Sequence, residues 1–157
     1  AAPFDFKPDY LPAPGIERFQ CGTPSVLAML ALGCGLATFA DVSMDELRDK
    51  SLRLSDLFWQ LMDEQCGEFG FACVSPREHA IRGSQLSFAH EHASAIMQAL
   101  IDRGVIGDFR QPNLLRFGFT PLYLRYTDVC DAVKVIREVM QCGAWKATRF
   151  QQRKQVT

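Results

Sequence analysis

The chain has 157 residues, of which 48% are hydrophobic and 22% are charged, and its formal net charge is −1. These values are typical of one globular domain with a substantial core, and they exclude a disordered or collagen-like chain. A net charge so close to zero gives no long-range reason to expect nucleic acid or an anionic membrane as a partner.

The longest apolar run, SVLAMLALGCGLATFA, lies at residues 25–40 and contains two glycines. It is shorter than the roughly 18 or more residues of a membrane-spanning helix, so no such helix is expected. The opening AAPFDFKPDYLPAPG has no basic region followed by an apolar one, which predicts that it is not a signal peptide. The missing initiator Met suggests a chain that begins part-way through something longer.

The N-terminal residues 1–22 are predicted to form an extended connecting segment, because residues 1–19 carry four prolines and little helical periodicity. The pattern changes at Thr23-Pro24, where threonine suits a helix N-cap and proline suits the first helical position. A helix is expected from there to Ala40, and its Ala/Gly/Leu composition suggests close packing on several sides.

A second helix is predicted to begin at SMDE, residues 43–46, which matches the capping box S-x-x-E. Apolar residues then recur at helical spacing to about Gln65. The apolar positions are Leu47, Leu54, Leu57, Phe58, Leu61 and Met62, and the polar face carries Arg48, Asp49, Lys50 and Asp56.

The remaining chain alternates between strand and helix patterns. Strands are predicted at FACVS, GSQLSFA and LLRFGF, an extended piece at VIGDFR, and a helix over EHASAIMQALIDRG that ends at Gly104. A final helix is expected from near Thr127 to near Gly143, with Val129, Val133, Ile136 and Met140 on one face, followed by a polar, basic tail. This order predicts an α/β chain of the α+β kind, a small sheet covered by helices.

The six cysteines never form a C-x-x-C pair, the close spacing that zinc and redox sites usually need. They are Cys21, Cys34, Cys66, Cys73, Cys130 and Cys142. Most lie among apolar residues, where a thiol behaves as a small hydrophobic side chain. Reduced thiols and a cytoplasmic location are therefore favoured over a disulfide framework.

One charged residue stands out in the apolar strand LLRFGFTPLY. If residues 114–119 form a strand, Leu115, Phe117 and Phe119 share the core face, and Arg116 lies on the other face near Gly118. The glycine leaves room for a ligand, and a guanidinium can grip a carboxylate with two donors. The alternative is a structural ion pair with a helix carboxylate such as Asp108 or Asp128.

Thr23 poses a similar choice. A helix N-terminus offers unpaired N–H groups and partial positive charge, so a hydroxyl there, next to Gly22, would suit a phosphate. The alternative is simply a capped helix.

Other motifs carry weaker signals. His90 and His92 form H-x-H, which could hold a metal, but no third ligand is evident, and His79 lies in a polar loop. The Gly-Ser of RGSQLSF, residues 82–88, is read as a turn that enters a strand. No metal site is predicted, and no G-x-S-x-G, P-loop or G-x-G-x-x-G sequence is present.

Several stretches, in this order, resemble the C-terminal part of bacterial kynureninases. They are GIERFQCGTPSVLAML, LRDKSLRLSDLF, VSPREHAIRGSQLSF, MQALIDRGVIGDFR and LRFGFTPLY, and the resemblance extends to the tail with Trp145, Phe150, Arg153 and the terminal Val-Thr. So many matched segments make the signal specific.

The resemblance implies a homodimeric pyridoxal-phosphate enzyme of the aspartate-aminotransferase-like fold. Its reaction is the hydrolysis of L-kynurenine to anthranilate and L-alanine in tryptophan catabolism. Residues 23–157 would form the C-terminal small domain, and residues 1–22 would connect it to a missing large domain.

The resemblance also implies roles for two residues. Arg116 falls on the arginine that binds the substrate's α-carboxylate, and Thr23 falls on the position that reaches the cofactor phosphate across the dimer interface. Gly22-Thr23 is the bacterial pattern, which points to kynurenine rather than to its 3-hydroxylated form.

The family's Schiff-base lysine lies in a Lys-Tyr motif, and no lysine of this chain is followed by tyrosine. No catalytic residue is therefore assigned to this chain, and it is expected to be inactive alone. Two alternatives are a relative of the cysteine desulfurases, for which no cysteine here has an activating setting, and a free-standing amino-acid-binding domain without catalysis.

Overall fold

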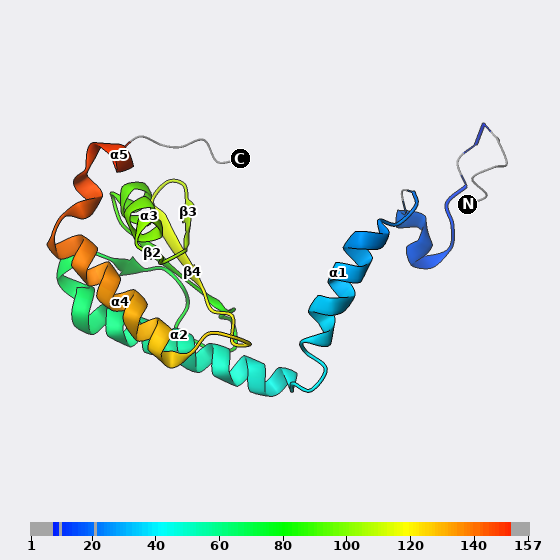
Figure 1. Ribbon diagram of the computed structural model, residues 1–157, viewed down its shortest axis with the longest axis horizontal. Helices are drawn as coiled ribbons and strands as arrows, with labels where there is room; N and C mark the ends of the chain where they lie inside the picture. The colour runs from blue at the N-terminus through cyan, green and yellow to red at the C-terminus, as the bar shows by residue number, and fades with distance from the viewer. Residues whose placement is uncertain (1–7, 10, 21, 152–157) are drawn as a thin grey trace. The chain divides into compact units, whose positions relative to one another are not determined.

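The computed structural model describes residues 8–9, 11–20 and 22–151. Contacts between residues divide the chain into two compact units, Ala1–Val42 and Ser43–Thr157. This division falls later in the chain than the boundary expected between residues 22 and 23. Where the small domain begins in the whole protein stays a prediction. Figure 1 labels most of the helices and strands of the two units.

The first unit holds a 3-10 turn, η1 (Gly15–Phe19), and the helix α1 (Val26–Ala37). Its N-cap is Ser25, so the expected N-cap at Thr23 is wrong. Serine is as good a capping residue as threonine and stands next to the first helical residue, although its side chain makes no cap hydrogen bond here. None of the residues of α1 is buried.

The second unit is an α+β domain, as expected. Its helices are α2 (Met44–Cys66), α3 (Ala93–Asp102), α4 (Tyr126–Gln141) and α5 (Thr148–Gln151), with 3-10 turns η2 (Gly67–Phe69) and η3 (Ala144–Lys146). Its strands are β1 (Ala72–Cys73), β2 (Gln85–Ala89), β3 (Asp108–Arg110) and β4 (Leu114–Gly118). They form one antiparallel-paired sheet in the order β1-β2-β4-β3.

The second helix forms as its sequence predicts. Ser43 is the N-cap, and its hydroxyl accepts a hydrogen bond from the backbone N–H of Glu46 at 3.5 Å. Its apolar stripe is buried, with Leu54 and Phe58 almost fully inaccessible. α2 runs beside α4 (Figure 1), and α4 buries the predicted Val129, Val133 and Ile136, together with Val139 in place of Met140.

The hydrophobic core lies between the helices and one face of the sheet. Leu86 and Phe88 of β2 and Leu115 and Phe117 of β4 point into it and meet side chains of α2, α3 and α4. The Phe58 ring lies 5.0 Å from Phe117, centroid to centroid, and 5.9 Å from Phe88. This packing explains why β2 and β4 alternate between buried and less buried residues.

The C-terminal segment is more ordered than a polar tail. Trp145 of η3 and Phe150 of α5 are both buried in the core cluster. The burial of these two residues was not predicted, because the segment is hydrophilic on average and single aromatic residues between charges give no periodic signal. Arg153 and the terminal Val-Thr lie outside the described residues. In the described part of the chain, no helix is both long and apolar enough to span a bilayer.

Candidate functional site

Arg116 lies in the middle of β4, between β2 and β3. Its Cα is paired with that of Ser87 on one side and that of Asp108 on the other. Since its neighbours Leu115 and Phe117 are buried among the helices, Arg116 points to the opposite face, as predicted. We call this the polar sheet face and define it by Gln85, Ser87, Asp108, Arg110, Arg116 and Gly118.

The guanidinium of Arg116 forms an ion pair with the carboxylate of Asp108. The Nη2 of Arg116 donates to Oδ2 of Asp108, and Nε of Arg110 lies 3.4 Å from the same oxygen. The side chains of Arg116 and Asp108 are 27% and 48% exposed, so solvent weakens their attraction. The Nε of Arg116 is buried without a hydrogen-bond partner among the described residues. The guanidinium therefore has hydrogen-bonding capacity beyond this pair.

The space predicted beside the arginine is present. A Cβ placed on Gly118, two residues along β4, would meet no described atom within 4 Å. On the neighbouring strand β2, the Ser87 hydroxyl accepts a hydrogen bond from Gln85 Nε2 at 3.2 Å. A planar cation, open space and neutral polar groups on one surface suit the carboxylate of a small amino acid.

Of the two carboxylates proposed as structural partners of Arg116, the structure selects Asp108. It lies on the strand β3, so its expected place on a helix is wrong. Asp128 instead accepts from the backbone N–H of Arg125 at 2.8 Å and from its guanidinium at 2.6 Å, at the start of α4. Hydrogen bonds from Arg125 hold the pKa of Asp128 below its usual value. Whether Arg116 also binds a substrate stays a prediction.

Thr23 is exposed and precedes the N-cap Ser25 by two residues. It therefore does not cap α1, which removes the simplest structural explanation for its hydroxyl. Thr23 belongs to the first unit and Arg116 to the second, so a site shared by the two stays a prediction.

The lysines that the structure describes are engaged elsewhere. Lys50 donates to the carbonyl of Pro121 at 2.6 Å, Lys134 pairs with Asp131 at 3.0 Å, and Lys146 lies 5.4 Å from the Trp145 ring. A contact of Arg116 with an amino-acid carboxylate and a contact of the Thr23 hydroxyl with a phosphate both stay predictions.

The two histidines of the H-x-H motif have structural partners. His90 Nδ1 accepts from the backbone N–H of His92 at 3.0 Å, so its Nε2 carries the proton that is donated to the Phe69 carbonyl at 3.1 Å. Burial lowers the pKa of His90, which keeps the ring neutral. His92 stacks on Trp145 at 4.4 Å. Among the described residues, no group of three or more His, Cys, Asp or Glu side chains could hold a metal.

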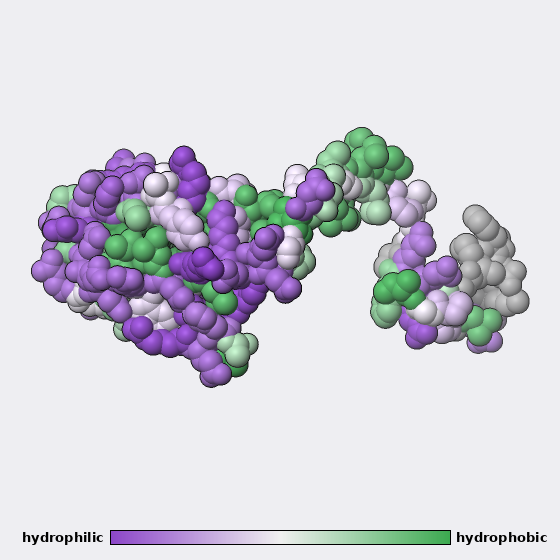
Figure 2. Space-filling model, turned by 90° about the horizontal axis from the view of Figure 1, so that it is seen from below, coloured by the Kyte–Doolittle hydropathy of each residue, from purple (hydrophilic) through white to green (hydrophobic). Residues whose placement is uncertain are grey.

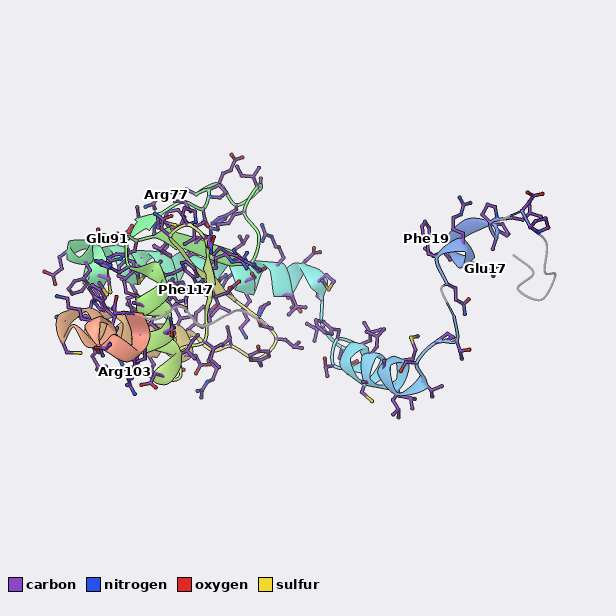
Figure 3. The ribbon with its side chains drawn as sticks, turned by 90° about the horizontal axis from the view of Figure 1, so that it is seen from above. Glu17, Phe19, Arg77, Glu91, Arg103 and Phe117 are labelled. Carbon is purple, nitrogen blue, oxygen red and sulfur yellow. The ribbon has the colours of Figure 1, made fainter. Side chains whose placement is uncertain are left out.

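Arg82 is a buried arginine that the sequence analysis missed. RGSQLSF does enter a strand through a turn, but the Arg82 side chain is only 2% exposed and pairs with Asp56. Together with Trp59 they line a cavity of about 340 Å³. The exposed Arg77, which Figure 3 labels, has its guanidinium carbon 4.3 Å from the centroid of the Trp59 ring. Asp56 on the polar face of α2 was the one available signal. The cluster ties the loop before β2 to α2.

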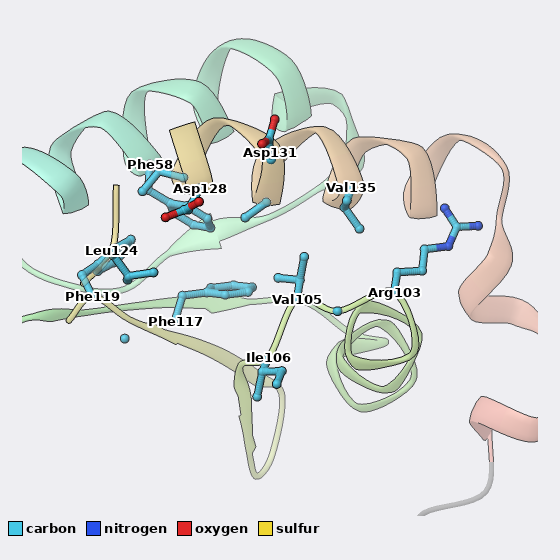
Figure 4. A pocket seen from close by; sticks show the side chains of 14 residues that line it. Phe58, Arg103, Val105, Ile106, Phe117, Phe119, Leu124, Asp128, Asp131 and Val135 are labelled. Atoms are coloured by element: carbon cyan, nitrogen blue, oxygen red, sulfur yellow. The ribbon is translucent and has the colours of Figure 1, made fainter. Parts of the chain in front are cut away.

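A second cavity, of about 360 Å³, opens on the helix-covered side of the sheet (Figure 4). Its walls are mostly apolar and include Phe58, Phe117 and Val135, with Asp131 and Arg103 among its charged residues. Arg116 does not line it.

Comparison with known proteins assigns the domain. The sequence model described as "Kynureninase C-terminal domain" matches residues 47–136, which is more than half of the chain. The chain belongs to the kynureninase C-terminal domain family. The matched region spans all four strands and includes Arg116, Asp108 and Gly118.

Relatives named kynureninase match almost the whole of this chain. One from Burkholderia mallei (strain SAVP1) and one from Burkholderia pseudomallei (strain K96243) are each 49% identical over 99% of this chain. One from Pseudomonas fluorescens is 47% identical over 98% of it. The resemblance found in the sequence is thus confirmed. The chain spans 38% of the Burkholderia proteins and 37% of the Pseudomonas protein, so it corresponds to part of such an enzyme.

Proposed function

We propose that this chain is the C-terminal portion of a kynureninase, a pyridoxal-phosphate-dependent hydrolase that cleaves L-kynurenine to anthranilate and L-alanine. The whole enzyme would act in tryptophan catabolism, in the kynurenine pathway towards NAD biosynthesis, as a cytoplasmic homodimer. The observation that carries the proposal is Arg116 on the polar sheet face, beside the space at Gly118 and within the region that matches the family.

In this proposal the chain contributes binding and orientation. Arg116 holds the α-carboxylate of kynurenine with two parallel hydrogen bonds, which fixes the direction of the bond that breaks. Its role is to bind and orient the substrate, not to transfer protons. Pyridoxal phosphate, when bound, supplies the electron sink that allows the carbon–carbon bond to break. Thr23 donates its hydroxyl to the phosphate of that cofactor.

The first test replaces Arg116 in the complete enzyme. Losing one partner of a desolvated charge pair costs on the order of 2–5 kcal/mol, so Arg116→Ala should lower kcat/KM by tens to thousands of fold. Arg116→Lys keeps the charge but loses the fork and should recover only part of this loss. Arg53→Ala is the matched control, because Arg53 is an exposed residue of α2 paired with Asp49. Normal kinetics in Arg116→Ala would refute the proposed role.

The second test concerns the cofactor. Thr23→Ala should weaken cofactor retention by about 1–3 kcal/mol, the value of one charge-assisted hydrogen bond, while Thr23→Ser should retain it. Dialysis of the complete enzyme against cofactor-free buffer, followed by its visible absorbance, measures the loss. Equal retention in Thr23→Ala and in the unmodified enzyme would exclude a phosphate contact.

Because Gly22-Thr23 is the bacterial pattern, the enzyme should also prefer kynurenine to 3-hydroxykynurenine.

The isolated chain should form no anthranilate, because no lysine of its sequence lies in the Lys-Tyr motif. Anthranilate fluorescence in the presence of kynurenine and added pyridoxal phosphate measures this directly. Saturable binding of amino acids by the isolated chain without pyridoxal phosphate would instead favour an amino-acid-binding domain.

A further inference from the structure

The ion pair of Arg116 shares its carboxylate with a second arginine. Asp108 and Arg110 are two residues apart on β3, so their side chains lie on the same face of the sheet. One oxygen of Asp108, Oδ2, accepts from Arg116 and lies 3.4 Å from Nε of Arg110. The polar sheet face thus holds two cations with a single anion between them.

This arrangement has one negative charge fewer than it has positive charges, and the carboxylate of the proposed substrate would supply that charge. With a ligand carboxylate bound to Arg116, the face would hold two arginines and two carboxylates, and its charges would balance. Asp108 is 48% exposed and Arg110 is 62% exposed, so both side chains are free to turn towards each other. Asp108 can therefore leave Arg116 without losing an ionic partner.

We propose that Asp108 is a positioning residue that holds the Arg116 guanidinium until the substrate carboxylate arrives and then moves to Arg110. This inference rests on the proposed role of Arg116. The resident pair is partly exposed and linked by one hydrogen bond, whereas a desolvated ligand carboxylate can bind the fork bidentately. The ligand carboxylate therefore displaces the carboxylate of Asp108 from Arg116, and Asp108 then pairs with Arg110.

The exchange predicts a specific coupling between two substitutions. Among the described residues of this face, Arg110→Gln leaves Asp108 with Arg116 as its only cationic partner, so Asp108 should compete more strongly with the ligand for Arg116. Asp108→Asn keeps the shape and an acceptor oxygen but removes the competing charge. In the Asp108→Asn background, Arg110→Gln should therefore change the affinity for the substrate much less.

The experiment measures dissociation constants in the complete enzyme for the two single variants and the double variant. The probes are L-kynurenine and the amine that has hydrogen in place of its α-carboxylate, and cofactor absorbance reports binding. For kynurenine, Arg110→Gln should weaken binding about fivefold and Asp108→Asn should tighten it about fivefold, the scale of one partly exposed ion pair. Within the Asp108→Asn background the Arg110→Gln effect should fall below about twofold. Binding of the amine should change in none of the variants.

Two results would overturn the exchange. One is an equal effect of Arg110→Gln on kynurenine binding with Asp108 present and with Asp108→Asn, which would mean that the two side chains act on the ligand independently. The other is weaker kynurenine binding in Asp108→Asn, which would mean that Asp108 only orients the guanidinium. Arg116→Ala separates this failure from failure of the proposed function. If that variant still prefers kynurenine to the amine, both ideas are wrong; if it loses the preference while the double variant is additive, only the exchange is wrong.

Discussion

Gly107 shows how little freedom the backbone has beside Arg116. A Cβ at this position would lie 2.8 Å from the Arg116 carbonyl oxygen and 2.6 Å from Cε of Met97. The methionine could move aside, but the strand carbonyl could not. Close approach of β4 to the loop after α3 therefore requires glycine, which fixes Asp108, the next residue, opposite Arg116.

Gly107→Ala should lower the free energy of unfolding by about 1–3 kcal/mol, because overpacking displaces the strand. Gly118→Ala is the matched control, since a Cβ there meets no described atom within 4 Å and should change stability by less than about 0.5 kcal/mol. Urea unfolding followed by circular dichroism measures both variants. Equal stability of the two would show that the backbone near Arg116 can adapt.

His90 gives the fold a dependence on pH. Burial lowers the pKa of His90 in the folded state, while the unfolded chain keeps a pKa near 6.5. The unfolded state then binds more protons between these two values. Stability is fully present above about pH 6.5 and falls as the pH drops towards the folded pKa of His90.

His90→Gln should make unfolding less sensitive to pH below about 6.5 than it is in the unmodified chain. Gln keeps an amide donor for the Phe69 carbonyl but cannot be protonated. His79→Gln is the control, because His79 is half exposed and lies beside Asp56 at the surface. Urea midpoints at pH 7.5 and pH 5.5 test this, and an unaltered pH response in His90→Gln would assign it to other groups.

At the scale of elements, periodic and capped segments were predictable. The capping box at Ser43 and the helical stripe after it placed α2 within one residue of its observed end, and alternation placed the buried and polar faces of β4. The start of α1 was not predictable, because Thr23 and Ser25 are both suitable caps and local rules do not choose between them. The Asp108–Arg116 contact depends on strand register, which residue spacing alone does not define.

The segment after α4 should contribute more to stability than its polar composition suggests. Trp145 is buried against α3, and its ring is stacked on His92. Trp145→Ala should cost about 3–5 kcal/mol, the usual loss for a large buried aromatic side chain. Tyr123→Ala, which removes a side chain that is 71% exposed, should cost less than about 1 kcal/mol. Similar thermal midpoints for both variants would mean that η3 and α5 are only loosely attached.

At the scale of the whole molecule, α1 is an apolar helix whose side chains are exposed in the described structure. Apolar residues cover all its sides, and Figure 2 shows the hydrophobic surface that it presents in that view. Leu27, Val26 and Leu36 are 80%, 68% and 63% exposed. A helix that is hydrophobic all round is normally buried, and a large exposed apolar surface promotes association. Since the relatives are more than twice as long as this chain, we predict that the rest of such a protein covers α1.

Cysteine labelling tests this cover. Cys34 lies on α1 and is exposed in the described structure, as is Cys142 after α4, whereas burial raises the pKa of Cys66 to about 11. In the isolated chain, kept dilute to limit self-association, a maleimide at pH 7.5 should label Cys34 and Cys142 quickly and Cys66 slowly. In the complete protein Cys34 should become at least about tenfold slower, because burial blocks access to its thiol, while Cys66 remains slow. Equal labelling of Cys34 in both would mean that α1 stays exposed, and an apolar helix would then face solvent in the complete protein as well.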